Sequence, residues 1–235
     1  KGIGAATAKM LAMAGAKVTA VSRNPQGLLS TLEGVDHNAV SLNLEDQNSI
    51  LEFISTIDEC HILINNAAGP PGGPLIENEI EDFIDPFKRH LHASHSLVKG
   101  LIPLMEKSGY GRIVNIISTS VKEPIPNIGL SNTLRGAMAS WAKSLSRELP
   151  ACVTINNVLP GFTDTDRLTS LAKSIQEKTG KDIEQIHSGW MDQVPINRLI
   201  DPLETGAAIA YLCMPISGGI RGVSLAVDGG RLRSI

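Results

Sequence analysis

Short apolar segments rich in β-branched residues alternate with helical stretches along the whole chain. Six of these segments are predicted to be strands: residues 17–21, 39–42, 61–64, 112–117, 154–158 and 222–227. They are apolar enough to be covered on both faces, as strands of a parallel sheet are. Strands that alternate with helices build a parallel sheet with helices on both sides. The sequence therefore predicts a doubly wound α/β fold.

We expect one domain over residues 1–235. This length is usual for a single α/β domain, and no Pro-, Gly- or Ser-rich linker, repeat or low-complexity segment divides the sequence. The one irregular interval, residues 163–197, is polar and contains a predicted helix at 168–178. Since ligands of open α/β sheets bind beyond the carboxyl ends of the strands, we expect this interval to form a lid that determines substrate choice.

The charge and the cysteines exclude several classes of function. A net charge of -3 and a pI of about 6.1, without a basic stripe, argue against nucleic acid or an anionic membrane as a partner. No segment approaches the roughly 20 apolar residues of a membrane span. Cys60, Cys152 and Cys213 lie far apart and form no Cys-x-x-Cys pair, so we interpret them as buried thiols in a reducing compartment. We expect a cytoplasmic protein that acts on a small molecule.

Two glycines open the chain in front of a predicted helix of small residues, 5–14. In Gly2-Ile3-Gly4, the missing Cβ atoms let backbone amides approach a pyrophosphate, and the N-terminus of the helix favours negative charge. The alternative is that these glycines form only a tight turn. A helix this early needs a preceding strand to complete a β-α-β unit, so we expect a segment upstream of Lys1.

Ser22-Arg23 directly follows a predicted strand, where the adenosine ribose of a dinucleotide would lie. The Arg23 guanidinium can bind a 2′-phosphate through two hydrogen bonds, whereas an acidic residue would accept from the 2′-hydroxyl of NAD. No acidic residue occupies this strand end. We therefore favour NADP(H) over NAD(H), the alternative being that Arg23 is a solvated surface residue.

Further segments follow in order: Asn65-Asn66-Ala67-Ala68-Gly69, Pro160-Gly161-Phe162-Thr163 and residues 225–230, Leu-Ala-Val-Asp-Gly-Gly. With the opening glycines they resemble the short-chain dehydrogenase/reductase family, in particular its β-ketoacyl-(acyl-carrier-protein) reductase-like branch, over essentially the whole chain. The resemblance implies a Rossmann fold and NAD(P)H-dependent carbonyl reduction. It also implies cofactor contacts from Gly2, Ile3, Gly4, Ser22, Arg23, Asn66, Ala67, Ala68, Gly69, Pro160, Gly161 and Thr163.

At the adenine pocket, Asn43-Leu44 stands where the family has Asp-Val. An amide can still hydrogen-bond the adenine amino group, so we include Asn43 and Leu44 among the expected cofactor contacts. The alternative is that Asn43 is only a turn residue.

The catalytic tetrad of the family, Asn, Ser, Tyr and Lys, is altered at three of its positions. Ser118 follows a predicted strand and matches the family serine, and the family's spacing then places Ser131 at the tyrosine and Arg135 at the lysine. On the preceding helix, His90 stands at the position of the asparagine. The resemblance implies that Arg135 also contacts the cofactor ribose.

These changes replace a proton donor and retain a cation. An aliphatic serine hydroxyl is far less acidic than a phenol of pKa about 10, so Ser131 is a poor general acid. Arg135 stays protonated and can hold the ribose or polarise a carbonyl. His90 can relay protons through water, or it is a structural histidine. Loss of a positioned acid costs about 10²- to 10⁴-fold in rate.

Two functions follow from this pattern. In the first, the protein transfers hydride from NADPH to a β-ketoacyl thioester or similar ketone; Ser118 polarises the carbonyl, and water ordered by Ser131 or His90 supplies the proton. In the second, it is a catalytically impaired nucleotide-binding homologue that acts as a sensor or partner subunit.

The remaining candidates suggest structure and assembly. Tyr110 precedes a strand and Tyr211 lies on an apolar helix predicted to face the core, so neither falls at the site. His92 and His95 lack a nearby Cys or carboxylate partner, and we expect no metal site. The predicted helix of small residues at 136–149 pairs across subunits in the family, which implies a homotetramer or homodimer.

Overall fold

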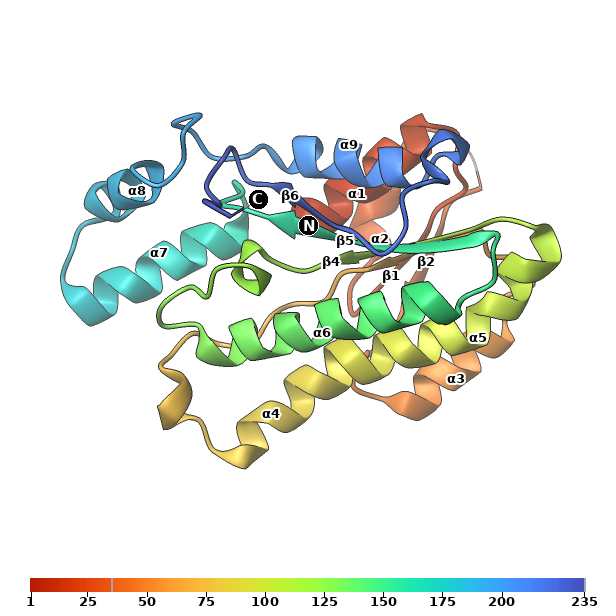
Figure 1. Ribbon diagram of the computed structural model, residues 1–235, viewed down its shortest axis with the longest axis horizontal. Coiled ribbons are helices and arrows are strands. Elements are labelled where there is room, and N and C mark those ends of the chain that lie inside the picture. The colour runs from red at the N-terminus through yellow and green to blue at the C-terminus, as the bar shows by residue number, and fades with distance from the viewer. Residues whose placement is uncertain (35, 235) are drawn as a thin grey trace.

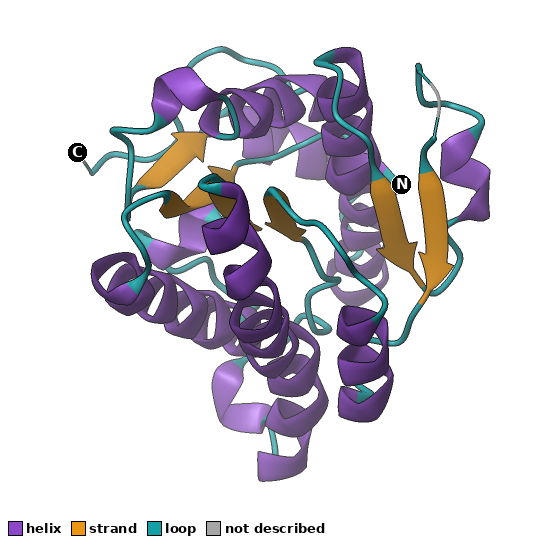
Figure 2. Ribbon diagram, turned by 90° about the vertical axis from the view of Figure 1, so that its right-hand side faces the viewer, coloured by secondary structure: helices purple, strands orange, loops and turns teal. Residues whose placement is uncertain are grey.

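The protein, described here from a computed structural model that covers residues 1–34 and 36–234, is built around parallel strands (Figure 1). Four strands form one sheet in the order β3 (Ile62–Asn65), β4 (Gly111–Ile116), β5 (Val153–Pro160) and β6 (Ser224–Val227). A second, two-stranded sheet pairs β1 (Thr19–Ser22) with β2 (Asn38–Ser41). All of these ladders are parallel, and Figure 2 shows the β1–β2 pair apart from the larger sheet.

Helices cover both faces of the sheets, which confirms the predicted doubly wound fold. On one face, α1 (Gly2–Met13) packs against α9 (Pro202–Leu212). The other face carries α3 (Gln47–Ser55), α5 (Ala93–Ser108) and α6 (Gly129–Glu148) (Figure 1). The short helix α2 (Gln26–Leu29) follows β1.

The remaining helical segments surround the carboxyl ends of the strands or lead into longer helices. α4 (Ile80–Phe87) continues through the π-helical turn η2 (Lys88–His92) into α5, and α7 (Asp166–Thr179) and α8 (Ile183–Met191) extend to one side in Figure 1. Short 3-10 turns are η1 (Leu75–Glu77), η3 (Thr119–Val121) and η4 (Pro215–Ser217). Among the described residues, no helix has both the length and the apolar character that crossing a membrane requires.

Burial of the strands is less uniform than the sequence predicted. β4 and β5 are buried along their whole length, as expected for central strands. The expectation that every strand is covered on both faces is wrong for β1 and β2, whose end residues are exposed, and for β6, in which Leu225 is 38% exposed. The reason is position: β6 is an edge strand, and within the described residues β1 and β2 pair only with each other.

A ladder of polar side chains crosses the four-stranded sheet and was not predicted. Asn65, Asn115 and Asn157 occupy the same register on β3, β4 and β5, and Ser224 continues it on β6. The Asn65 amide donates to Asn115 Oδ1 at 2.8 Å, Asn115 donates to Asn157 Oδ1 at 2.9 Å, and Asn157 donates to Ser224 Oγ at 3.1 Å. Each of the three asparagines therefore donates its side-chain amide to the neighbouring strand, which pairs these buried polar groups with one another.

The predicted helices and thiols also need correction. α1 begins at Gly2 and not at residue 5, so both glycines belong to its first turn. In the interval 163–197, α7 is longer than predicted and α8 was missed, although the capping box of Asp182 and Gln185 marks its beginning. Of the three cysteines only Cys213 is fully buried, and burial raises the pKa of its thiol to about 12.

Candidate active site

The site lies where the carboxyl ends of the parallel strands meet the N-terminus of α1. Parallel strands end at the same edge of a sheet, so the loops after β3, β4 and β5 open on one side. These loops carry Asn66 to Gly69, Ser118, and Gly161 to Thr163, most of the residues selected from the sequence. The fold thus brings together segments that lie about one hundred residues apart.

Close contacts at the opening glycines form a cradle without Cβ atoms. A Cβ on Gly4 would lie 2.5 Å from the Asn66 side-chain nitrogen, and Gly2 has a φ of +53°, a conformation that favours glycine. A Cβ on Gly2 would lie 3.3 Å from Thr165 Cγ2 at the start of α7. The first turn of α1 therefore packs closely against both the loop after β3 and the lid interval.

The end of β5 is packed just as closely. A Cβ on Gly161 would lie 2.7 Å from Asp228, so the residue after Pro160 must be glycine for the loop after β6 to approach. Thr163 is buried, and its hydroxyl donates to the Gly161 carbonyl at 3.2 Å. Its backbone also bridges to Ile200, which fixes both ends of the lid interval.

Of the four residues expected on the adenosine side, Ser22, Arg23 and Asn43 are exposed and Leu44 is partly buried. Ser22 and Arg23 are exposed at the end of β1, and within the described residues Arg23 makes no ion pair. Asn43 Oδ1 accepts from the Glu45 amide at 3.2 Å, so its side chain is engaged in a turn. Leu44 packs on the cluster around Leu42 and Ile50.

Arg135 and Ser131 are brought to the end of β4 by α6. Arg135 is only 8% exposed, and its guanidinium donates from Nη1 to the Ile116 carbonyl at 2.9 Å. Burial, together with the nearby Arg167 charge, lowers its pKa to about 10, so it remains a cation near neutral pH. Ser131 is buried one helical turn earlier, on the same face. Ser118 is the N-cap of η3, and its Oγ accepts from the Ser120 amide at 3.1 Å.

His90 lies in the π-helical turn and is almost completely buried. Its Nε2 is 2.9 Å from the Ala68 carbonyl, which requires that this nitrogen carry the proton. Burial and the Arg135 charge lower the pKa of His90 to about 3, although the bond to Ala68 opposes the shift. The ring is therefore neutral near pH 7 and engaged with backbone, which matches the structural alternative better than the proton relay.

Comparison with known proteins assigns the chain to a family. The sequence model of a family described as enoyl-(acyl carrier protein) reductase matches residues 1–231. The chain is 32% identical over 239 residues to 3-oxoacyl-(acyl-carrier-protein) reductase FabG of Vibrio cholerae, an alignment that covers 98% of this chain and 93% of FabG. The chain belongs to the short-chain dehydrogenase/reductase family.

Other members of the short-chain dehydrogenase/reductase family agree in sequence and fold. The NADPH-dependent reductase BacG of Bacillus subtilis is 30% identical over 251 residues, covering 100% of this chain and 95% of BacG. The solved structure of YwfH, an NADPH-dependent reductase involved in bacilysin biosynthesis, superimposes with a TM-score of 0.91 at 26% identity, covering 100% and 95% of the two chains. An actinorhodin polyketide ketoreductase with NADPH gives 0.92 at 26% identity, covering 99% and 94%.

One functional candidate in this short-chain dehydrogenase/reductase was missed from the sequence. Arg167, in the first turn of α7, reaches across to the loop after β3 and donates to the Gly69 and Pro70 carbonyls at 3.4 and 3.2 Å. Desolvation lowers its pKa, although part of the side chain remains open to solvent. The sequence gives no signal that separates Arg167 from the lysines of the same interval, Lys173, Lys178 and Lys181.

The aromatic and histidine residues that the sequence placed outside the site were Tyr110, Tyr211 and His95. Tyr110 donates to the Cys213 carbonyl away from the site. Tyr211 is 46% exposed, so the prediction that it faces the core is wrong; its neighbours Ile209, Ala210 and Leu212 fill the inward face of α9. His95 lies against the Trp141 ring, at a centroid distance of 6.3 Å.

Proposed function

We propose that this short-chain dehydrogenase/reductase is an NADP(H)-dependent carbonyl reductase that acts on a 3-oxoacyl thioester or a related small ketone. The observation that carries the proposal is the buried Arg135 guanidinium, fixed to the Ile116 carbonyl and one turn from Ser131. A preorganised cation in a buried site stabilises negative charge that develops on a carbonyl oxygen. The names of FabG and BacG, both reductases, support the same reaction class.

The residues around the glycine cradle fit a dinucleotide cofactor. The first turn of α1, Asn66 and Thr163 would hold it, because a Cβ on Gly4 would fill the space between α1 and the loop after β3. Arg23 would bind the 2′-phosphate, which favours NADP(H). When bound, the reduced nicotinamide supplies the hydride.

The protein groups divide the remaining work. Ser118 accepts a hydrogen bond from the Ser120 amide, so its own hydroxyl hydrogen is free to donate to a substrate carbonyl. Arg135 stabilises the alkoxide that forms there. A proton taken from Ser131 would have to be returned by solvent, because Ser131 is a poorer general acid than the family's tyrosine, and the neutral His90 already donates to Ala68. We therefore propose that a water molecule hydrogen-bonded to Ser131 donates the proton to the alkoxide. That water becomes hydroxide and leaves to solvent.

Turnover tests this proposal directly. We expect the full-length protein to consume NADPH in the presence of 3-oxoacyl thioesters, and the rate to fall by about 10²-fold or more in Ser118→Ala. Ser144→Ala, at an exposed serine of α6, is the matched control and should retain the wild-type rate. Equal rates in the two variants would refute the assigned role. Binding of NADPH without turnover of any carbonyl would favour the catalytically impaired alternative.

A charge reversal tests the cofactor assignment. Arg23→Glu should lower the affinity for NADPH by about tenfold or more and leave NADH less affected, because only NADPH has the 2′-phosphate. Lys17→Glu, an exposed lysine just before the same strand, controls for the change in net charge. An equal loss of NADPH affinity in Arg23→Glu and Lys17→Glu would exclude a specific phosphate contact at Arg23.

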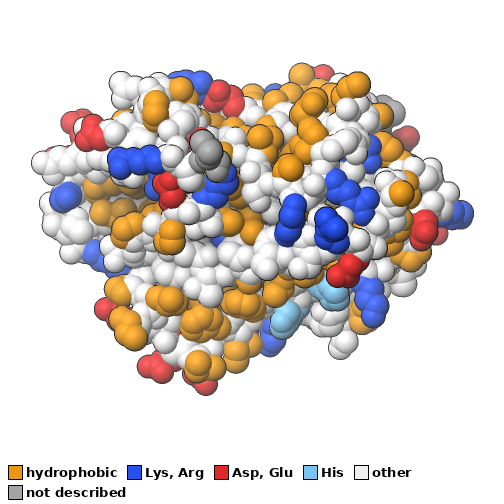
Figure 3. Space-filling view, viewed as in Figure 1, with side chains coloured by type: hydrophobic (Ala, Val, Ile, Leu, Met, Phe, Trp, Pro, Cys, Tyr) orange, Lys and Arg blue, Asp and Glu red, His pale blue; other side chains and the backbone are white. Residues whose placement is uncertain are grey.

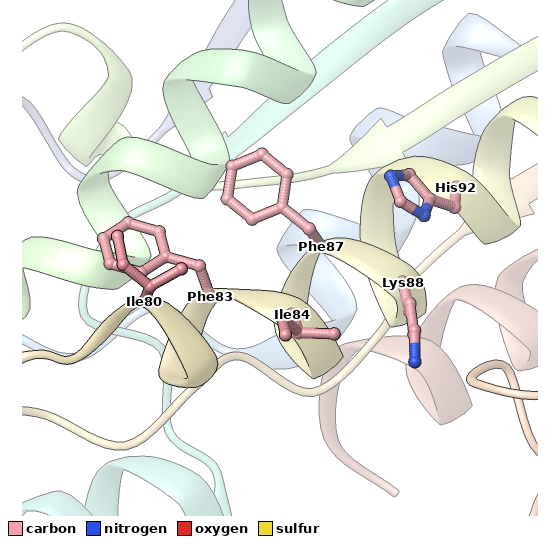
Figure 4. Close-up of a pocket in the computed structure, with 6 residues that line it drawn as sticks. All are labelled: Ile80, Phe83, Ile84, Phe87, Lys88 and His92. Atoms are coloured by element: carbon pink, nitrogen blue, oxygen red, sulfur yellow. The ribbon is translucent and has the colours of Figure 1, made fainter.

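We also propose that the protein assembles as a homodimer or homotetramer. One apolar groove on the outer side of α4 is lined by Ile80, Phe83, Ile84 and Phe87, with Lys88 and His92 at one end (Figure 4). Hydrophobic side chains also gather over this region in Figure 3. A second apolar surface includes Ile216, Val223 and Leu225 beside the edge strand β6. We expect light scattering to give the mass of two or four chains, and Ile80→Glu to lower it; a wild-type monomer would refute the assembly.

A further inference from the structure

Two guanidinium groups from different helices converge on Gly69. A Cβ on Gly69 would lie 3.4 Å from Arg135 Nη2 and 3.0 Å from Arg167 Nη2. The two nitrogens are therefore no farther apart than the sum of these distances. Arg135 comes from α6, whereas Arg167 comes from α7 in the lid interval.

This pair of cations has no anionic partner among residues 1–34 and 36–234. Ion pairs in this part of the chain involve other side chains, including Arg89 with Glu45. Arg135 and Arg167 donate only to neutral carbonyls, those of Ile116, Gly69 and Pro70. Arg135 is buried, whereas Arg167 is exposed at the start of α7. A buried charge such as that of Arg135 is normally paired, because desolvation without a counter-charge is unfavourable. The lowered pKa of Arg135 has the same origin, because both its burial and the nearby Arg167 charge disfavour the charged guanidinium.

We propose that Arg135 and Arg167 form a binding site for one anionic group of a ligand, either a carboxylate of the substrate or a phosphate of the cofactor. Guanidinium groups bind both through paired, charge-assisted hydrogen bonds. The substrate is the source that we expect. Arg135 is the residue assigned to the reacting oxygen, and Arg167 belongs to the lid, so an anion between them would lie near the carbonyl. Within the substrates proposed above, the site then favours a small ketone with a free carboxylate, an oxo acid, over a thioester; this inference rests on the proposed reductase function.

Direct binding tests the site without depending on turnover. Acetoacetate and its methyl ester share the same ketone and differ in one negative charge, so both are titrated by calorimetry against the NADP⁺-saturated protein. We expect wild-type protein to prefer the acid, and Arg167→Gln to weaken acetoacetate about 10- to 100-fold while leaving the ester within about threefold. Arg167→Lys should recover part of the loss, because it restores charge without the planar fork.

The matched control is Lys173→Gln, which removes one positive charge from an exposed position of the same helix. It should bind acetoacetate as the wild type does. Circular dichroism melting of each variant verifies that α7 and the rest of the fold are retained.

A titration of the free protein with NADPH distinguishes the two sources of the anion. If Arg167→Gln weakens NADPH about tenfold or more and does not alter the preference for acid over ester, the site binds a cofactor phosphate. If neither acetoacetate nor NADPH binding changes relative to Lys173→Gln, the proposal is wrong. Preferential binding of acetoacetate would support this site even if neither acetoacetate nor a 3-oxoacyl thioester is reduced when NADPH replaces NADP⁺, and that lack of turnover would count against the proposed reductase function.

Discussion

The asparagine ladder across the central sheet gives the sharpest test of how this fold is stabilised. In Asn115→Ala, the Asn65 amide loses its acceptor and Asn157 Oδ1 loses its donor. Asn115 is completely buried, so water cannot replace either bond without entering the sheet. Each orphaned buried group costs about 1–3 kcal/mol, and the variant should lose about 2–6 kcal/mol of unfolding free energy.

Guanidinium denaturation at fixed protein concentration measures this loss. The midpoint should fall at an unchanged m-value, and the melting temperature should drop on the order of 10 °C, since about 1 kcal/mol corresponds to about 2–4 °C in a chain of this size. Ser224→Ala removes one acceptor at the half-buried end of the ladder and should cost only about 1 kcal/mol. Asn48→Ala, at an exposed position of α3, should cost less than either. An Asn115→Ala loss no greater than that of Asn48→Ala would refute the argument.

Three further predictions concern the site. Burial depresses the pKa of His90 to about 3 in the folded state against 6.5 when unfolded, so its contribution to stability is fully present above pH 6.5 and is lost as the pH falls toward 3. Denaturation at pH 7 and pH 5 should therefore show a smaller loss of stability in His90→Asn than in wild type, by about 2 kcal/mol. The double change Ser131→Tyr with Arg135→Lys should raise the NADPH-dependent reduction rate about 10²- to 10⁴-fold by restoring a general acid; an unchanged rate would show that the proton route does not limit turnover. Gly4→Ala places a Cβ 2.5 Å from the Asn66 side chain and should weaken NADPH binding measured by nucleotide fluorescence, with little effect on the melting temperature.

The parts of the fold that the sequence predicted well are those set by local pattern. The apolar runs place all six strands to within two residues, because short β-branched segments between helices mark the strands of a parallel sheet. Edge strands are half-exposed, and their apolar residues do not show which neighbour covers them. The asparagine ladder depends on the registers of β3, β4 and β5, and three asparagines on separate strands do not reveal that they are opposite one another.

In the candidate site too, residues set by local motifs were predicted and residues set by long-range contacts were not. Ser118 and Arg135 were found by their place in ordered motifs, whereas Arg167 could not be, because its contact with Gly69 and Pro70 joins segments far apart in sequence. For His90 the sequence offered two alternatives, a proton relay and a structural histidine, but not the contacts that decide between them. Its histidine chemistry suggests a proton relay, but burial and a neighbouring cation keep the ring neutral.

The altered tetrad and the arginine pair have a common electrostatic consequence. In the pattern that the chain resembles, a tyrosine beside a lysine can become an anion, so the protein itself can supply negative charge at the site. Ser131 cannot ionise near neutral pH, yet the cation is retained at Arg135 and a second one is added by Arg167. The positive potential above Gly69 therefore has no counter-charge among the described residues and is available to a ligand. An anionic substrate that binds between the two guanidinium groups would reduce the repulsion between them. The alkoxide formed by hydride transfer would then lie in a positive potential that no tyrosine anion neutralises.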